Sequence, residues 1–525
     1  MPSSSPPLLV VLTCLPLAGA LLLLALPSAR TALLRLVALA ATLATAGVAA
    51  IVWRDYGGEA SAFEYAVPWF TLPGSGVEVQ FKLGLDGLSF LMCVFTAFLM
   101  PIVMLSAYGH VGQRVKEFLV WMLVMETGML GVFLSLDLVL FYFFWEISLV
   151  PLYFVLGIWG GERRLYATLK FFLYTLAGSL LMLVAVIWLV YAARTQGRIT
   201  QASDLSELMA FAPTLPSTTQ AWLFFAFAIA FAIKVPLLPF HTWLPDAHTE
   251  APTAGSVVLA GVLLKMGTYG LLRFCIGLFP EPAARFAPLF MALGAIGIAY
   301  GALLAMAQND IKRLIACSSV SHLGYVVLGL FALTDSGVRG GVLQMVNHGI
   351  STGLLFLLVG MVYERRHTRA LDEFGGIAKA MPVFAVCFTI AVLSSVGLPG
   401  LNGFVGEYMI LAGSFEASPL WAAVGTSGLV LGAVYLLSAT RRLLLGPVLR
   451  RENAELGDLN AREIGLLVPL LVLVVWIGVR PADFLARCEP SLNALVERAQ
   501  AARVNLASAS DEARLLALSS EGDLR

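Results

Sequence analysis

Long apolar runs separated by short polar connections dominate this sequence. A bilayer core of roughly 30 Å takes about 20 apolar residues of helix, and fourteen runs come close to or exceed that length. Strands of a membrane barrel would be shorter and would alternate apolar with polar residues, so these runs predict helices. We therefore expect an all-α polytopic membrane protein with about fourteen transmembrane helices. The runs lie near 8–26, 32–53, 84–107, 118–136, 138–159, 168–192, 222–240, 254–278, 284–306, 311–333, 340–362, 382–413, 419–440 and 464–480.

Two of these runs are interrupted by proline and glycine. The first continues into Pro236 and Pro239 directly after "FAIK", and the second contains "SSVGLPGLNGFVGEYMILAG" from 394 to 413. A pair of broken helices in corresponding halves is typical of transporters built from inverted repeats around a site near the middle of the membrane. We therefore expect two inverted five-helix repeats, each with one broken helix. The expected parts are helices 1–3 in 1–110, helices 4–8 in 111–280, helices 9–13 in 281–447, and the last helix with a polar tail in 448–525.

Composition agrees with an integral membrane protein. Hydrophobic residues make up 59% of the chain and charged residues 13%, against about 25% charged residues in soluble domains. The net charge of +0 gives no sign of a nucleic-acid partner. The sequence holds no CxxC pair, phosphate loop, metal-ligand cluster, catalytic triad, or flavin or nicotinamide fingerprint. We therefore expect no cofactor and no redox chemistry in this chain.

Basic residues gather in alternate connections. With the N-terminus outside, the connections on the inside are richer in lysine and arginine, and they lie near 114–116, 163–164, 312–313, 365–369 and 441–451. Because basic connections stay on the cytoplasmic side, a multi-pass protein with both termini in the periplasm or its equivalent is expected. The tail from 481 to 525 is expected to form a short amphipathic helix followed by disorder.

Four ionisable residues lie at a depth where charge is expensive, and they are Glu146, Lys234, Lys265 and Glu407. On insertion scales each costs about 2.5–3.5 kcal/mol at a helix centre. Structural explanations exist: the lysines could snorkel, Glu146 could merely neutralise a lysine, and Glu407 could be interfacial. Together with the broken helices, however, they favour proton exchange. Burial brings the pKa values of lysines and carboxyl groups in general toward neutrality, and a nearby opposite charge moves them back. Glu146 and Lys234 are expected to form such a pair.

Histidines extend this set. His322 in "IACSSVSHLGYVVLG" and His348 in "GVLQMVNHGISTGLLF" lie in the middle of successive spans, among serine, threonine and asparagine residues. Histidine titrates near neutrality with little perturbation, so both are candidate proton relays; a core histidine satisfied by a hydroxyl, or a haem ligand, is the alternative. His241 and His248, in the loop after the first break, are expected to line an aqueous entrance. Glu126 is a weaker intramembrane acid that either tunes Glu146 or only packs.

The same residues lie in stretches that resemble a known family. "KVPLLPFHTWLPDAHTEAPTAGSVVLAGVLLKMGTYGLLR", "NDIKRLIACSSVSHLGY", "NHGISTGLLFL" and "GLPGLNGFVGEY" are similar to the blocks of the antiporter-like membrane subunits of respiratory complex I, the proton-translocating NADH:quinone oxidoreductase. The resemblance covers roughly 80–450. Related subunits usually carry a lysine in the second broken helix. The glutamate at 407 resembles instead the middle antiporter-like subunit, called M or chain 4.

The resemblance implies a role for each candidate residue and a set of partners. Glu146 and Lys234 would be the input pair on the cytoplasmic side, Lys265 the central relay, His322 and His348 the connecting axis, and Glu407 the end of the exit path. The chain would act as a subunit of a translocase in a bacterial inner membrane, with proton transport coupled to electron transport. NADH, FMN, iron–sulfur clusters and quinone would be bound by partner subunits. The two flanking antiporter-like subunits and membrane lipids would be its neighbours.

Two other functions compete with proton pumping in complex I. One is a stand-alone or multisubunit secondary Na⁺/H⁺ antiporter driven by ion gradients, and the other is a non-transporting scaffold. Glu407 favours the complex I subunit over the antiporter. A scaffold would have little reason to keep six titratable groups at the depth of the membrane centre.

Overall fold

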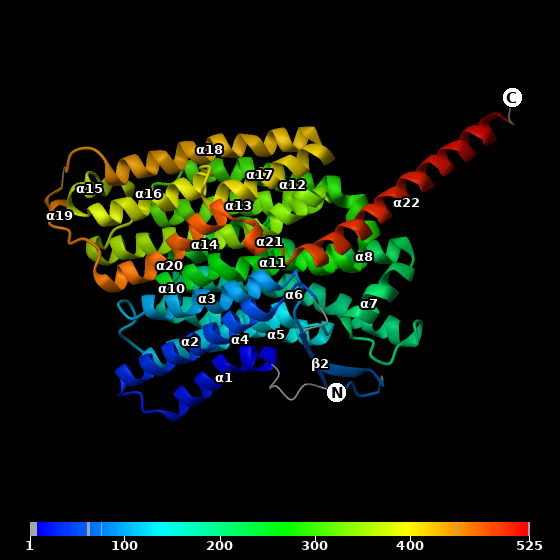
Figure 1. The fold of residues 1–525 in the computed structure, drawn as a ribbon, viewed down its shortest axis with the longest axis horizontal. Helices are drawn as coiled ribbons and strands as arrows, with labels where there is room; N and C mark the ends of the chain where they lie inside the picture. Colours follow the sequence, from blue (N-terminus) through cyan, green and yellow to red (C-terminus); the bar gives the residue numbers. More distant parts are fainter. Residues whose placement is uncertain (1–7, 60–62, 75, 449, 523–525) are drawn as a thin grey trace.

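The computed structural model describes residues 8–59, 63–74, 76–448 and 450–522, with side chains as far as residue 508. Long helices run nearly parallel to one another in a single bundle (Figure 1). In the described residues, 12 helices are long and apolar enough to cross a membrane. They are α1 (Leu8–Ala25), α2 (Thr31–Asp55), α4 (Val115–Leu134), α5 (Leu138–Trp159), α6 (Arg164–Thr195), α8 (Ser217–Lys234), the segment Thr253–Ile276, α12 (Pro280–Met306), α13 (Ile311–Ala332), α14 (Asp335–Arg366), α18 (Pro419–Leu444) and α20 (Ala461–Val479).

The remaining two predicted runs coincide with shorter apolar helices. The run at 84–107 contains α3 (Phe90–Ser106), and the run at 382–413 divides into α16 (Pro382–Val396) and α17 (Asn402–Ala417). The polytopic helical class is confirmed, while a total of fourteen spans and the inverted relation of the two halves stay predictions. Short helical pieces occupy the connections: η2 (Ala212–Thr214), η6 (Leu371–Glu373), α15 (Ile377–Ala380) and α19 (Arg451–Ala454).

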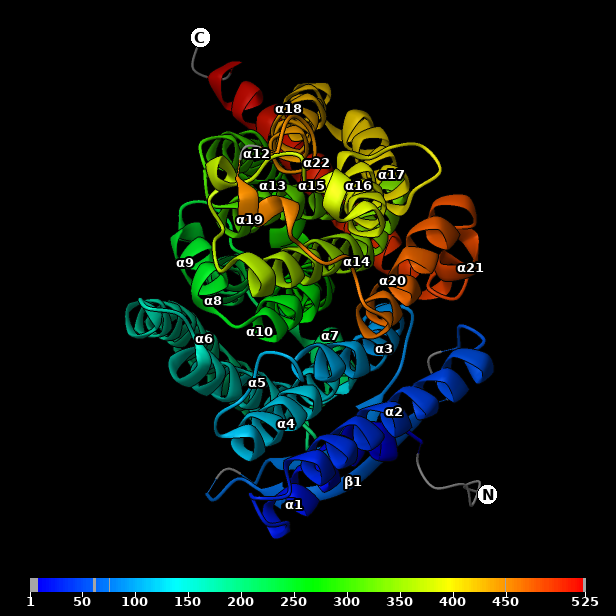
Figure 2. The ribbon, with the colours of Figure 1, turned by 90° about the vertical axis from the view of Figure 1, so that its left-hand side faces the viewer.

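Three segments occupy the middle of the bundle, as the view along the helices shows (Figure 2). The most apolar stretch of α13, of α14 and of Thr253–Ile276 is completely buried, whereas only 33% of that stretch is buried in α1, α18 and α20. A polar side chain on a central segment is therefore sealed from lipid by other helices. Buried polar groups need partners inside the protein, so the central segments are where such groups must bond to one another.

Both predicted helix interruptions are present. Helix α8 ends at Lys234 and is followed, after a connection, by η3 (Phe240–Thr242) and α9 (Trp243–Glu250). Prolines in that connection lack the N–H that a continuing helix needs. Helix α16 ends before Gly397, which has a φ of +83°. Glycine takes this left-handed conformation without strain and commonly ends helices.

One central segment is not a regular α-helix. Within Thr253–Ile276, α10 (Thr253–Val258) passes into a π-helical turn, η4 (Leu259–Leu263), then into α11 (Leu264–Gly270) and a second π-helical stretch, η5 (Leu271–Ile276). Such turns are rare and occur frequently at functional sites. The apolar pattern did not predict them.

A β-hairpin stands outside the helical bundle, and the sequence pattern did not predict it. Strands β1 (Glu64–Thr71) and β2 (Glu78–Gly84) pair antiparallel, with a register shift between Pro68 and Phe70. Lys82 Nζ lies 2.5 Å from Asp204 Oδ2, which ties the hairpin to the start of α7 (Leu205–Phe211).

The prediction for the C-terminal tail was wrong for the part that the structure describes. After α21 (Ala482–Leu485), α22 continues as one helix from Glu489 to Gly522. Its first turns carry Leu492, Leu495, Val496 and Ala499, all buried, and the helix packs against α12 and α14. This spacing places the four side chains on one helical face, and burial of that face holds the helix on the bundle.

Candidate functional site

Four of the six predicted site residues form one line through the centre of the bundle. Lys265 on α11 places its Nζ 2.6 Å from His348 Nδ1 on α14. The ring of His348 lies 5.6 Å, centroid to centroid, from the ring of His322 on α13. His322 Nδ1 in turn lies 3.0 Å from Glu407 Oε1 on α17. All four side chains are buried, so their polar atoms meet one another instead of solvent.

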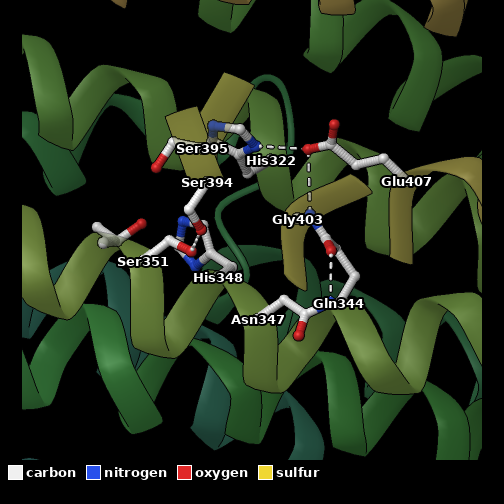
Figure 3. Close-up of a pocket in the computed structure, with 10 residues that line it drawn as sticks. His322, Gln344, Asn347, His348, Ser351, Ser394, Ser395, Gly403 and Glu407 are labelled. Carbon is white, nitrogen blue, oxygen red and sulfur yellow. Dashed lines mark hydrogen bonds and ion pairs between the residues drawn. The ribbon is translucent and has the colours of Figure 1, made fainter. Parts of the chain in front are cut away.

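A small polar cavity is lined by both histidines, and Figure 3 shows the residues around it. Its volume is about 10 Å³, close to the least that holds one water molecule. Hydroxyl and amide side chains line it together with both histidines and the carboxyl group: Gln344, Asn347, Ser351, Thr352, Ser394, Ser395 and Glu407. The lining is polar on all the helices that meet there, so the cavity is suited to a bridging water.

The helix break places Glu407 at this cavity. Asn402, the first residue of α17, donates from Nδ2 to the backbone oxygen of Asn347 at 3.3 Å, and Asn347 donates back to the backbone oxygen of Asn402 at 2.8 Å. Gly403 follows, and a Cβ there would collide with the backbone oxygen of Ser394. Only glycine lets α17 start this close to α16. One turn later, Glu407 accepts a hydrogen bond of 3.1 Å from Gln344 Nε2.

The π-helical turn positions Lys265. Besides its contact with His348, Lys265 Nζ donates a hydrogen bond to the backbone oxygen of Ala260, which lies within η4. The side chain is fully buried, so it does not snorkel to the interface. The irregular turn thus supplies a carbonyl acceptor to a buried amine.

Glu146 and Lys234 lie apart from this line and are not in ion-pair contact with each other. Lys234 is 2% exposed at the last residue of α8. Its Nζ faces the rings of Trp145 and Phe171, at 5.4 and 5.8 Å from their centroids, a cation–π arrangement. Glu146 is half-buried on α5, and its charge reaches Lys234 electrostatically. Glu126 on α4 is fully buried with both carboxyl oxygens unbonded. The input-pair role stays a prediction.

The expectation for His248 was wrong. This residue is on α9 and is 0% exposed, stacked on Phe356 with ring centroids 4.7 Å apart. Neither ring nitrogen has a hydrogen-bond partner, and the side chain lies within electrostatic reach of Lys265 and Lys312. His241 is also buried, at 7% exposed. Proline-rich sequence suggested a loop, whereas the chain folds back as a helix inside the bundle.

Lys312 is a buried lysine that the sequence pattern placed only among the basic connections. It is buried and donates from Nζ to the backbone oxygen of Ala251 at 2.5 Å. A cavity of about 260 Å³ opens beside it, lined in part by His110, Glu250, Thr253 and Arg369. The only available sequence signal was its place in the "NDIKRL" stretch.

Comparison with known proteins identifies the family of this chain. The family model described as "NADH:quinone oxidoreductase/Mrp antiporter, TM" matches residues 135–432. NADH-quinone oxidoreductase subunit M of Rhodobacter capsulatus is 45% identical, over 82% of this chain and 85% of that protein. One chain of respiratory complex I from Thermus thermophilus with bound NADH superposes with a TM-score of 0.84 at 35% identity, covering 94% of this chain and 99% of that one.

A chain of the Mrp complex from Dietzia sp. DQ12-45-1b shares the fold. Its TM-score is 0.80 at 20% identity, over 95% of this chain and 100% of that one. At this identity the likeness concerns the fold alone, whereas the relatives at 35–45% identity are complex I subunits. This chain belongs to the NADH:quinone oxidoreductase/Mrp antiporter family of membrane subunits, among the relatives of subunit M.

Proposed function

We propose that this chain translocates protons as a membrane subunit of an NADH:quinone oxidoreductase, in response to quinone reduction in other subunits of the complex. The observation that carries the proposal is the line of four titratable side chains from Lys265 to Glu407. Charged groups are costly at this depth, and a merely structural network would not need four groups that can each bind and release a proton.

The chemistry of the line is a series of proton transfers. The ammonium group of Lys265 can give a proton to Nδ1 of His348, at 2.6 Å. Nε2 of His348 has no hydrogen-bond partner, so the imidazolium can release its other proton there. A water in the small cavity would carry it to His322, and Nδ1 of His322 can pass a proton to Glu407 at 3.0 Å. Each imidazole accepts on one nitrogen and releases from the other, so no net charge stays on the rings.

Uptake and release lie at opposite ends of this line. The cavity beside Lys312 lies among basic connections, which mark the cytoplasmic side. We propose that protons enter there and reach Lys265 past His248, with Glu146 and Lys234 as the input pair that biases each step. Release follows at Glu407 toward the periplasm. Both termini then face the periplasm of a bacterial inner membrane, and the halves 111–280 and 281–447 act as inverted repeats.

The proposal places the redox chemistry in partner subunits. NADH, FMN, iron–sulfur clusters and quinone would be bound there, and this chain would respond to quinone reduction through its contacts. We propose the two flanking antiporter-like subunits as its direct neighbours, together with membrane lipids and without nucleic acid.

The test begins with purification of the tagged full-length chain from native membranes in a mild detergent. The expected result is a large assembly that contains flavin and iron–sulfur clusters and pumps protons after reconstitution with NADH and quinone. Lys265→Met in the same assembly should abolish pumping while NADH oxidation by an artificial acceptor continues, since that reaction needs only the partner subunits. A small cation-transporting complex without flavin would overturn the proposal in favour of a multisubunit Na⁺/H⁺ antiporter.

A further inference from the structure

An apolar cavity of about 310 Å³ lies between α2, α3 and α20. In the view along the helices, α3 lies between α2 and α20 (Figure 2). The side walls are helices whose most apolar stretches are only 28% and 33% buried, so the cavity lies near the surface of the bundle. Small and aromatic side chains line it, including Ala49, Trp53, Phe95, Phe98, Trp476 and Phe484. None of the predicted proton-relay residues belongs to its lining.

One end of the cavity, called its mouth below, is lined by the aromatic side chains of Trp53, Trp476 and Phe484. Trp53 is near the end of α2, and Phe484 on α21 packs edge-on against both Trp53 and Trp476, with centroids 5.4 and 5.3 Å away. Tryptophan favours the membrane–water interface, so this end lies at headgroup level. The other end is lined by Ala46, seven residues before Trp53 on the same helix. At 1.5 Å per residue the cavity is roughly 10 Å deep.

An arginine that has no ion pair among the described residues lies against Trp53, one of the aromatic residues of the mouth. The guanidinium carbon of Arg487 is 4.7 Å from the centroid of the Trp53 ring, which itself lines the cavity. Nη1 of Arg487 has no hydrogen-bond partner among the described residues, and the side chain as a whole is half-buried. The nearby carboxylate of Asp483 is already engaged by Trp476 Nε1 at 2.9 Å and by Arg480 at 3.2 Å. A buried guanidinium nitrogen without a partner is unusual, and its strongest partner would be a phosphate or carboxylate.

We propose that this cavity binds one acyl chain of an anionic phospholipid, with the lipid phosphate on Arg487. The apolar cavity matches the acyl chain of such a lipid, and the guanidinium of Arg487 at headgroup level matches its phosphate. The volume of about 310 Å³ is at the low end of the 300–1,000 Å³ of small-ligand pockets. A transmembrane helix of a neighbouring subunit, about 10–12 Å wide with side chains, would not fit without moving α2 or α20.

The bound acyl chain would also be separated from the relay residue His348 by only one side chain, that of Phe95. Phe95, in the cavity wall, packs directly on Gly349, where a Cβ would meet Phe95 Cε1 at 2.6 Å. Gly349 follows His348 in the sequence. An acyl chain against the other side of Phe95 would keep water away from this flank of the relay. This second effect rests on the proposed function, whereas the lipid site itself does not.

The experiment uses the full assembled complex in detergent and a phosphatidylglycerol probe with a diazirine in one acyl chain. After photolysis, peptide mapping should place the label on α2, α3 or α20. Unlabelled phosphatidylglycerol should compete, whereas inorganic phosphate and diacylglycerol should not, because each supplies only half of the recognised molecule. Competition by phosphate alone would overturn the acyl-chain part, and competition by diacylglycerol would overturn the phosphate part.

Two substitutions and one matched control complete the test. Arg487→Gln should raise the half-saturating probe concentration at least about tenfold, the usual worth of one charge-assisted hydrogen bond. Ala49→Phe should abolish labelling of the cavity by filling it. Arg451→Gln removes an exposed arginine on α19 that is paired with Glu455, before the start of α20, whereas the cavity is lined by residues near the end of α20; it should change nothing. Equal labelling in Arg487→Gln and the unmodified complex, or a protein cross-link from a neighbouring subunit in place of lipid, would overturn the proposal. Labelling is read independently of pumping, so its failure is distinguishable from a failure of the proposed function.

Discussion

Replacement of His348 by leucine gives a direct test of the relay. Leucine fills much of the space of the imidazole ring but has no nitrogen to accept or release a proton. In the structure, His348 Nδ1 is 2.6 Å from Lys265 Nζ, and its ring centroid is 5.6 Å from that of His322. Without the ring, both contacts that link Lys265 to His322 are lost, and only a chain of waters could replace them. The cavity beside the ring has room for about one water.

The expected loss follows from the usual worth of a positioned acid–base group, about 10²–10⁴-fold in a proton transfer. We expect His348→Leu to pump at about 1% of the normal rate or less, measured with a pH-sensitive dye in reconstituted vesicles alongside quinone reduction. His348→Ala should retain more activity, because the vacated space admits about two further waters at roughly 30 Å³ each. Both variants also remove one of the two hydrogen-bond partners of Lys265, while the backbone oxygen of Ala260 remains, and this costs about 1–3 kcal/mol of stability.

A control separates loss of the relay from loss of stability. Ser321→Ala removes a buried hydrogen bond of 2.8 Å to the backbone oxygen of Ile298, next to His322 but outside the line. This variant should lose thermal stability and keep normal pumping. If His348→Leu shows the same behaviour, with normal pumping and a lower melting temperature, then His348 is a satisfied core residue and the relay assignment is refuted.

Three further predictions concern the ends and the scaffold of the site. Glu407→Gln keeps the shape and the hydrogen bonds but cannot ionise, so this variant should lose most of the pumping. Glu407→Asp should retain much of the pumping, and Glu407→Lys should pump faster than the glutamine variant. Wild-type pumping in the glutamine variant would exclude Glu407 from the proton path. Lys234→Ala and Glu146→Ala should each lose most proton-coupled turnover in an intact assembly, because each substitution leaves the charge of the remaining partner uncompensated. A normal rate of turnover in either variant would contradict the input-pair role. Gly403→Ala should impair pumping, measured as above, although no titratable group changes, since the new Cβ forces α17 away from α16. Gly432→Ala has no atom within 4 Å of its Cβ and should leave pumping unchanged.

Local sequence determined the helices, their interruptions and the candidate residues. A run of about 20 apolar residues has one stable form in lipid, because the backbone must satisfy its own hydrogen bonds. The helix interruptions after Lys234 and before Asn402 followed from proline and glycine in the same way. Lys265 and Glu407 stood out because a charge at that depth is expensive unless the protein uses or pairs it. These are properties of short segments and need no knowledge of neighbours in space.

Only the tertiary structure decided which candidates meet. Lys265 and His348 lie 83 residues apart in the chain, and His322 and Glu407 lie 85 apart; their contacts depend on how each helix is rotated and how closely helices approach. A helix turns by about 100° per residue, so an error of one residue in rotation would point a side chain at a different neighbouring helix. Glu146 and Lys234 had an equal claim from sequence, yet they lie out of contact, and His248 proved to be buried. Uniformly apolar spans carry no pattern that marks the inward face, and packing of the whole bundle therefore selected it.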